Sequence, residues 1–397
     1  KLGLIHASGA PIRNTIITNN QDYEIYFRNT GVMIADVDYS LIEGGEADGV
    51  FFEGQNNATL NWGNNNLTNS AAMFNDLPNG DYTLSQYAQA IGTADPTVTP
   101  PKDILGNARP LPSGSTPDMG AFESSLGVSV PKPTLVTVKK DGSGLFTNIS
   151  DAVEWSSAGD TILISPGTYQ ENIEMVDKSL HLASLYLTTG DTAYIRSTIL
   201  DGNENGYPLR IRSSDQNNKV ANAKLSGFTI QNGRSIDEKS GSGLRFEYAD
   251  SIRGDYLVIR DNISSGVGGG IRGAETNYAS FESVVIRNNT ASQGAGVYSE
   301  KVNIDFTNSI IKSNSLNGAS DGGGIYLVGY GDARFINCTV ADNQIYDSRN
   351  GSGFAMNYWE YSDSVLFYNT IFANNKGVSG GLPGQIQLSS NNIAILN

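Results

Sequence analysis

One short stretch of the sequence has the spacing of a calcium-binding loop. Asp201, Asn203 and Asn205 alternate and are followed by Gly206, which matches the first half of a loop whose carboxylate and amide oxygens surround Ca²⁺. The twelfth position of such a loop needs a bidentate glutamate, and here it is Arg212. Asn-Gly clusters are also ordinary turns between strands. Calcium therefore stays an alternative to a plain turn, and the sequence otherwise predicts no metal and no cofactor.

A second set of residues has the chemistry of a sugar-binding surface. After five glycine-rich steps comes an apolar residue and then a residue that should point outward, because successive strand residues point to opposite faces. These outward residues, together with aromatic residues in the loops beside them, are Arg245, Arg272, Tyr298, Tyr326, Tyr358 and Trp359. Aromatic faces beside guanidinium groups suit sugar rings. Stacking that only stabilises the sheet explains the same column, so both interpretations stay open.

The sequence offers little for acid–base or thiol chemistry. It has two histidines, His6 and His181, and His181 alternates with leucines as in a strand, so we interpret both as structural residues. The single cysteine, Cys338, excludes an internal disulfide and is expected to be a small packed side chain. We predict no catalytic residues.

These residues must be positioned by a repeat that covers residues 225 to 375. Six similar phrases end 29, 27, 25, 29 and 32 positions apart, at Gly233, Asn262, Asn289, Asn314, Asn343 and Asn375. A period of this size marks stacked supersecondary units. Eight positions before each end stand Leu225, Gly254, Phe281, Phe306, Phe335 and Phe367, and three positions before stand Ile230, Ile259, Ile286, Ile311, Val340 and Phe372. Like residues should stack in inward columns, which predicts an all-β parallel β-helix.

An asparagine column is expected at a bend of this helix. Six positions before the end of the last three phrases stand Asn308, Asn337 and Asn369, and Asn14 has the corresponding place in a matching phrase near the start of the chain. Buried asparagines in successive coils can hydrogen-bond one another and satisfy the backbone of the turn. We therefore predict that these four side chains are buried and form a ladder.

The chain divides into two β-helix units. Residues 1–123 are interpreted as the last coils and closing tail of one unit, 124–134 as a proline-containing linker, and 135–397 as a second unit with a cap over 135–173 and coils over 174–397. A short capping helix is predicted near 148–157, with Thr147 or Asn148 as its N-cap. Residues 11–20 match residues 366–375, so we expect a window cut from a tandem array, with the second unit truncated.

Two stretches resemble known families. The run formed by residues 81–85, 90–92, 103–110 and 117–123 resembles the end of bacterial surface β-helix proteins of the choice-of-anchor Q type, which implies an exported protein. In this tail Arg109 should form an ion pair with Asp118 or Glu123. Residues 141–173 resemble the N-terminal cap of pectin methylesterase-like and pectate-lyase-like right-handed β-helices, which implies a right-handed solenoid. The catalytic phrases of pectin methylesterases, polygalacturonases and pectate lyases have no counterpart in the sequence.

Charge and repeat together favour a structural role. The chain has 41 acidic and 26 basic residues and a net charge of −15, which argues against nucleic acid as a partner. We predict a non-catalytic, extracellular structural or adhesive module of a large bacterial surface protein, such as a stalk, fibre or appendage. A polysaccharide-active lyase or esterase and a carbohydrate-binding module are the alternatives. Expected partners are neighbouring β-helix units of the same chain, further copies in a homo-oligomer or filament, and cell-surface glycans, without direct insertion into a membrane.

Overall fold

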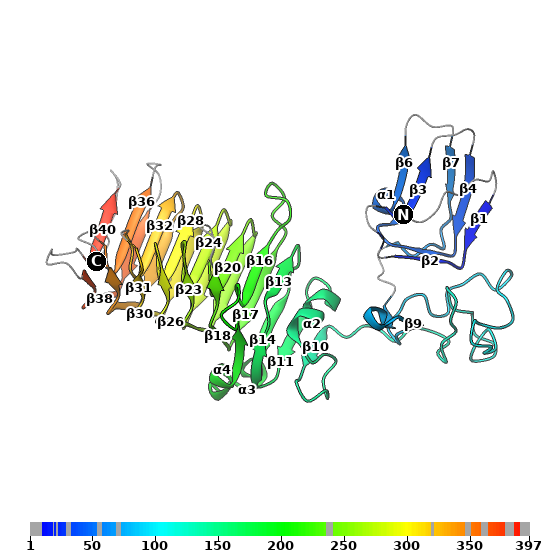
Figure 1. Cartoon of the computed structure of the whole chain (residues 1–397), viewed down its shortest axis with the longest axis horizontal. Coiled ribbons are helices and arrows are strands. Elements are labelled where there is room, and N and C mark those ends of the chain that lie inside the picture. Colours follow the sequence, from blue (N-terminus) through cyan, green and yellow to red (C-terminus); the bar gives the residue numbers. More distant parts are fainter. Residues whose placement is uncertain are drawn as a thin grey trace. The chain divides into compact units, whose positions relative to one another are not determined.

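The protein consists of two compact units. The computed structural model describes residues 10–18, 20, 23–28, 33–53, 58–68, 73–235, 241–318, 321–345, 351–358, 364–377 and 385–389. Unit 1 is Lys1–Lys132 and unit 2 is Pro133–Asn397, a boundary that falls inside the predicted linker. Each unit contains coils of parallel strands (Figure 1), and the predicted all-β parallel β-helix is confirmed.

Unit 2 stacks its coils into four parallel sheets, in which each strand pairs with the corresponding strand of the next coil. The first sheet contains β10 (Leu135–Val138), β11 (Thr161–Ile164), β14 (His181–Ser184), β17 (Asn222–Ser226), β21 (Ser251–Asp255), β25 (Tyr278–Glu282), β29 (Asn303–Thr307), β33 (Ala333–Ile336) and β37 (Val365–Tyr368). The second contains β12 (Gly167–Gln170), β15 (Thr198–Asp201), β18 (Thr229–Gln231), β22 (Val258–Arg260), β26 (Val285–Arg287), β30 (Ile310–Lys312), β34 (Thr339–Ala341) and β38 (Ile371–Ala373).

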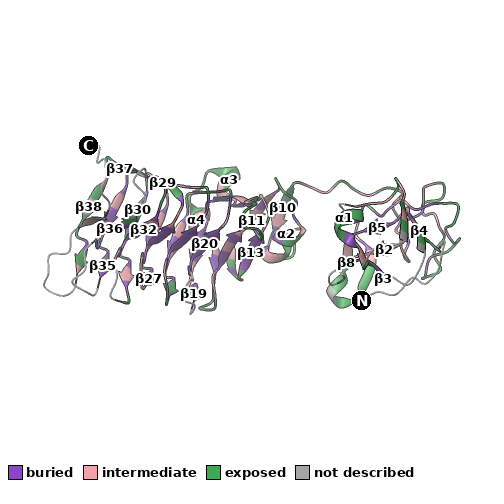
Figure 2. Cartoon of the chain, turned by 90° about the horizontal axis from the view of Figure 1, so that it is seen from above, coloured by how far each residue is buried: buried purple, intermediate pink, exposed green. Residues whose placement is uncertain are grey.

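The other two sheets of unit 2 complete each coil. The third sheet contains β13 (Ile173–Val176), β16 (Leu209–Arg212), β20 (Leu244–Glu247), β24 (Ile271–Ala274), β28 (Val297–Glu300), β32 (Ile325–Gly329), β36 (Phe354–Tyr358) and β40 (Ile386–Ser389). The fourth contains the short strands β19 (Arg234–Ser235), β23 (Ile263–Ser264), β27 (Thr290–Ala291), β31 (Ser315–Leu316), β35 (Gln344–Ile345) and β39 (Lys376–Gly377). Buried residues run through the strands of successive coils (Figure 2).

A capping helix stands at the start of unit 2, as predicted. Helix α2 spans Ile149–Trp155, and the side chain of Asn148 accepts a hydrogen bond from the Asp151 backbone N–H at 2.8 Å. Glu171 accepts hydrogen bonds from the backbone N–H groups of Ile149 and Ser150, so a carboxylate faces the positive end of the helix. Two further helices, α3 (Tyr186–Thr189) and α4 (Ala193–Ser197), stand between β14 and β15 and were not predicted.

The two inward columns have the predicted register. Leu225 pairs with Gly254, Gly254 with Phe281, and the pairing continues through Phe306 and Phe335 to Phe367. The column with Ile230, Ile259, Ile286, Ile311, Val340 and Phe372 is likewise continuous. The rings of Phe306 and Phe335 are 5.6 Å apart and nearly parallel. Gly254 leaves room for Phe281, because a Cβ atom there would lie 2.8 Å from its ring. Cys338 is buried, as expected.

The asparagine ladder exists, but at a different position of the repeat. Asn308, Asn337 and Asn369 are exposed and Asn14 is half-buried, so the prediction that they are buried is wrong. Their φ angles lie between 49° and 53° at Asn14, Asn308 and Asn369 and reach 55° at Asn337. Asparagine tolerates this left-handed region better than most residues. The turn geometry therefore accounts for this column, although Asn337 does donate to Asn308 at 3.2 Å.

The buried ladder is formed by the last residue of the second to sixth phrases. Its members are Asn262, Asn289, Asn314, Asn343 and Asn375, followed by Gln385. The Nδ2 group of Asn343, for example, donates to Oδ1 of Asn375 in the next coil at 2.9 Å and to the carbonyl of Ile311 in the previous coil at 3.0 Å. Its Oδ1 accepts from both the backbone N–H and the side chain of Asn314 at 3.0 Å. Each amide thereby links three coils.

Unit 1 contains a shorter stack with the same architecture. Its parallel sheets are β1 (Ala10–Arg13), β4 (Met33–Asp38) and β7 (Ala58–Trp62); β2 (Ile16–Ile17) and β5 (Leu41–Ile42); and β3 (Ile25–Arg28) and β6 (Val50–Glu53). A short helix, α1 (Gly45–Gly49), precedes β6, and an antiparallel hairpin follows from β8 (Phe74–Asp76), the 3₁₀ turn η1 (Leu77–Asn79) and β9 (Asp81–Leu84).

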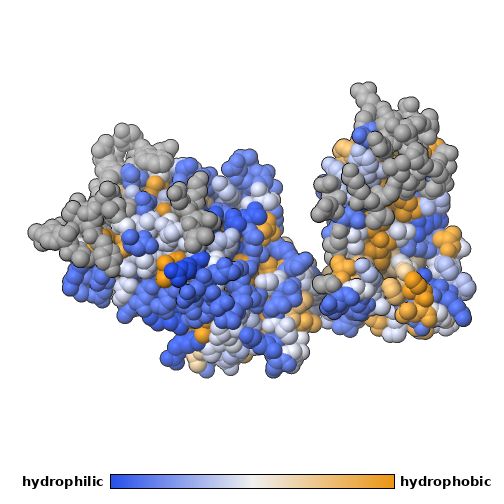
Figure 3. All heavy atoms as spheres, in the orientation of Figure 1, coloured by the Kyte–Doolittle hydropathy of each residue, from blue (hydrophilic) through white to orange (hydrophobic). Residues whose placement is uncertain are grey.

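The tail of unit 1 packs along the side of its coils. Ile17 and Ile42 face the inner core, whereas Ile16, Leu41 and Leu67 belong to a second cluster with tail residues such as Ile91 and Met119. The tail thus covers an outer face that runs across three coils. Orange hydrophobic residues are visible on this unit in Figure 3.

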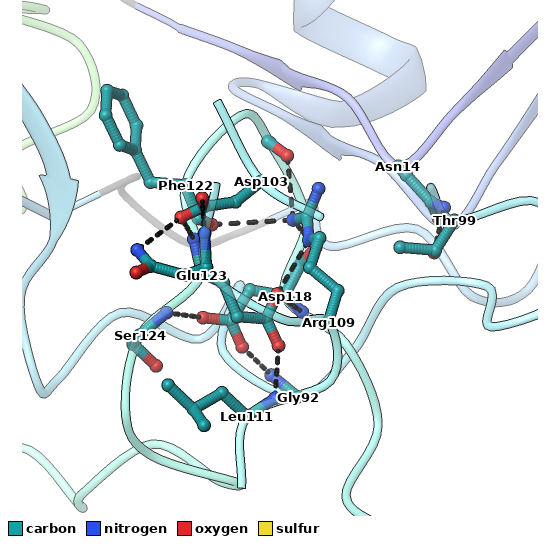
Figure 4. A network of polar contacts seen from close by, with 12 residues as sticks. Asn14, Gly92, Thr99, Asp103, Arg109, Leu111, Asp118, Phe122, Glu123 and Ser124 are labelled. Atoms are coloured by element: carbon teal, nitrogen blue, oxygen red, sulfur yellow. Dashed lines mark hydrogen bonds and ion pairs between the residues drawn. The ribbon is translucent and has the colours of Figure 1, made fainter. Parts of the chain in front are cut away.

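A buried polar network holds the tail in place. Arg109 Nε donates to Glu123 Oε2 at 2.7 Å, which confirms one of the two predicted ion pairs. Asp118 instead accepts from the backbone N–H groups of Gly92 and Ser124, and Asp103 accepts from that of Glu123 (Figure 4). Burial raises the pKa of Asp118 despite these bonds. Because the carboxylates are used to satisfy backbone N–H groups, the network is structural.

In the part of the chain that the structure describes, every helix is too short and too polar to cross a membrane.

Phe335→Ala tests the aromatic column. Phe335 has no solvent exposure and packs between Phe306 and Phe367, so truncation removes contacts on both sides and leaves a cavity. We expect a loss of about 3–5 kcal/mol in the free energy of unfolding, measured by denaturant titration. A loss below about 1 kcal/mol would contradict the packing of the column.

Asn343→Ala tests the contribution of the amide ladder to stability. Asn337→Gly, which changes an exposed asparagine, is its control. Asn343→Ala leaves several buried donors and acceptors without partners, each worth about 1–3 kcal/mol, so we expect a loss of about 3 kcal/mol or more. Asn337→Gly keeps the left-handed turn without strain and should cost less than about 1 kcal/mol. Equal losses in denaturant titrations would show that the ladder does not carry stability.

Candidate functional site

The calcium-like stretch forms a closed turn at the end of β15. Asp201 Oδ1 accepts from the backbone N–H of Asn203 at 2.8 Å, and Oδ2 accepts from the side chains of Gln231 and Asn232 at 2.7 and 2.8 Å. Both carboxylate oxygens are therefore directed at N–H donors, while the side chains of Asn203 and Asn205 are exposed. No group of three His, Cys, Asp or Glu side chains that could hold a metal ion occurs within the described ranges. The turn interpretation accounts for the stretch.

The predicted outward column has the expected register but is not an open surface. Arg245 pairs with Arg272, Arg272 with Tyr298 and Tyr298 with Tyr326 along the third sheet. Yet Arg272, Tyr298 and Tyr326 are only 6%, 8% and 9% exposed, which corrects the expectation that their faces are free to stack on sugars.

The glycine-rich steps explain this burial, because they pass directly over the column. A Cβ atom on Gly241 would lie 2.4 Å from Arg272 Cβ, and one on Gly322 would lie 2.6 Å from Tyr326 Cβ. The column is thus a second packed layer between sheet and loops. The side chain of Tyr358 and the whole of Trp359 lie outside the described residues.

The arginines of the column surround a single carboxylate. Glu247 Oε1 accepts from Arg210 Nε at 2.9 Å, while Oε2 accepts from Arg245 Nη2 at 2.8 Å and Arg272 Nη1 at 3.3 Å. Although burial opposes it, the hydrogen bonds of Arg210 and Arg245 lower the pKa of Glu247. Burial, together with the neighbouring Arg245, lowers the pKa of Arg272. Glu247 thus binds all three guanidinium groups within the packed column, which favours a structural role for the column.

A different depression opens on the outer face of the first sheet. It has a volume of ≈ 500 Å³ and is lined from β14, β17, β21, β25, β29 and the residues beside them. Two rows of outward side chains form its floor: His181, Lys224, Arg253, Ser280 and Asp305 in one row, and Ser226, Asp255, Glu282 and Thr307 in the other. Members of a row belong to neighbouring coils and are about 4.8 Å apart. We call this depression the groove.

Three residues in the groove form a chain of hydrogen bonds. His181 Nε2 lies 2.8 Å from Ser226 Oγ, and Ser226 Oγ donates to Asp255 Oδ1 at 2.6 Å. Because Ser226 donates to the carboxylate, His181 Nε2–H must be the donor to Ser226 Oγ. Burial lowers the pKa of His181, with Lys224 acting in the same direction and Asp255 opposing it. His181, interpreted from sequence as structural, therefore lines the candidate site.

Aromatic rings stand on both sides of the groove. Tyr256 packs against Tyr186 of α3, with ring centroids 4.6 Å apart and ring planes tilted by 37°. Burial, together with Tyr256, Asp255 and Glu282, raises the pKa of Tyr186 to about 12. On the other side Tyr278 donates to Asp305 at 2.7 Å, and Asp305 also pairs with Arg334. Helix α3, which was not predicted, also contributes Leu187 to the lining of the groove.

A sequence signal for the groove exists and was missed. The inward column stands eight positions before the end of each phrase, so the residues nine and seven positions before it must point outward. Those positions contain Lys224 and Ser226, Arg253 and Asp255, Ser280 and Glu282, and Asp305 and Thr307. Five of these eight outward residues are ionisable and the other three carry hydroxyl groups, which marks a functional surface better than the glycine-covered column does.

The fold and the groove define an all-β parallel β-solenoid with a polar surface groove. No protein-family model and no curated protein matches the sequence. Among solved structures, pectin methylesterase PemA from Erwinia chrysanthemi is similar over 64% of this chain and 93% of its own, with 11% identity and a TM-score of 0.36.

Two further solved structures are similar at the same level. The pectin methylesterase from carrot shares 14% identity over 68% of this chain and 90% of its own, with a TM-score of 0.35. Tailspike protein 2 of Escherichia coli O157:H7 bacteriophage CAB120 shares 11% identity over 69% and 44%, with a TM-score of 0.32. Likeness at these values carries no argument about activity or ligands.

His181→Gln tests the burial of the histidine through pH. Because the pKa of His181 is lowered in the folded protein, the unfolded chain takes up a proton near pH 6.5 while the folded protein does not. The stability from neutral His181 is therefore present above pH 6.5 and is lost as the pH falls. Thermal melts from pH 7 to pH 5 should decline more steeply for the wild type than for His181→Gln. Parallel curves would contradict burial of the neutral ring.

Proposed function

We propose that the chain is a non-catalytic, extracellular structural and adhesive module of a bacterial surface protein or appendage, and that it contacts glycans through the groove. The groove on the first sheet carries this proposal, since it combines an open depression, tyrosine rings on two sides and a floor of ionisable side chains. The neighbouring third-sheet column is mostly buried, and three of its arginines are bound to Glu247, so it is not the proposed contact surface.

The composition of the groove suits sugars. Tyrosine rings can pack against the apolar face of a sugar ring. Carboxylates such as Asp255 and Glu282 accept hydrogen bonds from the hydroxyl groups of a sugar. The regular spacing of about 4.8 Å between coils repeats these partners along the groove, which favours an extended chain of similar units.

The repetitive stack supports the structural part of the proposal. Each coil of unit 2 pairs with the coil before and the coil after, so a stalk can lengthen by adding coils without a new core. Neighbouring β-helix units, a homo-oligomer or a filament are the partners we propose for this role. Figure 3 shows a mainly hydrophilic face on unit 2, as expected of a surface exposed to water.

The alternative function is a polysaccharide lyase or esterase, and one contact favours it. A serine hydroxyl beside histidine and aspartate has the residue types of a nucleophilic site. However, Ser226 is only 3% exposed and donates to Asp255, whereas a nucleophilic serine must face the substrate and give its proton to the histidine. Asp305 is engaged by Tyr278 and Arg334. The order of the hydrogen bonds therefore supports the non-catalytic proposal.

Tyr256→Ala and Tyr278→Ala test the proposed contact surface. Each removes one wall of the groove, so binding of oligosaccharides found on a glycan array should weaken roughly 10-fold, about 1.4 kcal/mol, in calorimetric titrations. Tyr330→Ala is the control, because Tyr330 is 45% exposed and does not line the groove. Glycan binding that is unchanged in both groove variants would reject this surface.

The same preparations should show no turnover of pectin, alginate or similar polysaccharides, with or without Ca²⁺. Product release detected by chromatography, and lost in Ser226→Ala, would reject the non-catalytic proposal and support the esterase or lyase.

A further inference from the structure

Two cations stand side by side in the groove without partners. Lys224 on β17 and Arg253 on β21 are direct neighbours in register, and both are exposed. Within the described ranges neither forms a hydrogen bond or an ion pair through its side chain. Four other arginines of unit 2 are instead bound to carboxylates: Arg210, Arg245 and Arg272 bind Glu247, and Arg334 binds Asp305. Adjacent like charges are unfavourable, so this pair is suited to receive an anion.

The carboxylates of the groove do not neutralise this pair. Asp255 accepts a hydrogen bond from the Ser226 hydroxyl, and Asp305 is bound by Tyr278 and Arg334. Asp255 and Glu282 belong to the second row, two residues further along their strands, which is about 7 Å away. An anionic group bound to Lys224 and Arg253 is therefore nearer to both cations than to either carboxylate. Because Coulomb energies fall with distance, its attraction to the two cations exceeds its repulsion from the two carboxylates.

We infer that Lys224 and Arg253 form a subsite for an anionic substituent of a glycan, while Asp255 and Glu282 accept hydrogen bonds from the hydroxyl groups of the same sugar. This inference rests on the proposed function and adds the chemical class of the ligand. A carboxylate suits the pair best, because the guanidinium of Arg253 can donate two parallel hydrogen bonds to it. Sulfate and phosphate substituents share this chemistry.

The row of carboxylates restricts the ligand to a single charge at this place. A dense polyanion laid across the groove would meet Asp255 and Glu282 as well as the cations, and the net charge of −15 would also repel it. A glycan whose charged group is confined to one substituent avoids both the local repulsion by the carboxylates and the repulsion by the net charge. The subsite therefore selects acidic sugars within otherwise neutral chains.

The experiment compares the binding of matched acidic and neutral glycans to the full 397-residue protein chain. A glycan array that contains neutral, carboxylated, sulfated and phosphorylated members is followed by calorimetric titration of the best acidic ligand and its neutral parent, such as 3′-sialyllactose against lactose. We expect the acidic member to bind at least 10-fold more tightly, and the difference to shrink as salt is raised. The sulfated and phosphorylated members show whether the subsite accepts any anion or prefers carboxylate.

Variants separate this inference from the proposed function. Lys224→Gln with Arg253→Gln should remove the preference for the acidic ligand but keep binding of the neutral parent, whereas Lys312→Gln, an exposed lysine on the second sheet, should change neither. Thermal melts verify that the variants are folded. Equal binding of acidic and neutral glycans by the wild type, or an unchanged preference in the double variant, overturns the subsite and leaves the groove as a neutral sugar site. A complete absence of glycan binding overturns both proposals.

Discussion

The coils of unit 2 depend on the buried amide ladder that begins at Asn262. At each phrase end the chain must turn sharply between the second and fourth sheets, and the turn places backbone N–H groups inside the protein. The Oδ1 of the next coil's asparagine accepts the backbone N–H and the side-chain Nδ2 of the previous one. Because each amide has a partner above and below, the cost of burying polar groups is offset along the whole stack. The ladder therefore also aligns the apolar columns beside it.

The glycine steps follow from the same constraint. The third residue of each step is a glycine that lies against an asparagine of the ladder. A Cβ atom on Gly324 would lie 2.5 Å from a carbonyl of the next coil and 2.9 Å from Asn343 Nδ2. Only glycine leaves room for the amide and for the neighbouring backbone. The loops can then fold over Arg272, Tyr298 and Tyr326. The glycine-rich steps suggest flexible turns in the sequence, but in the structure they are required for close packing.

The repeat period and the inward columns could be predicted from the sequence, because one residue in two must be apolar when a face is buried. Phe306, Phe335 and Ile311 are where this rule places them. The buried asparagines could not be separated from exposed ones by residue type, since both positions suit asparagine: Asn343 for its amide bonds and Asn337 for its left-handed φ. The groove depends on alternation across several coils and on helix α3, which has no strong helical pattern in the sequence. Long-range contacts of this kind are set by tertiary packing rather than local preference.

The direction of the inter-coil hydrogen bonds has a mechanical consequence. These bonds, like the amide ladder, run from coil to coil along the axis of the stack. Tension applied along that axis therefore loads the bonds of the terminal coil first, and the coils peel away one at a time. Each coil that opens releases 25 to 32 residues of chain, or roughly 80–110 Å at about 3.3–3.6 Å per residue. A module of this kind unfolds in steps under tension and lengthens greatly before its last coil unfolds, so that it dissipates mechanical energy.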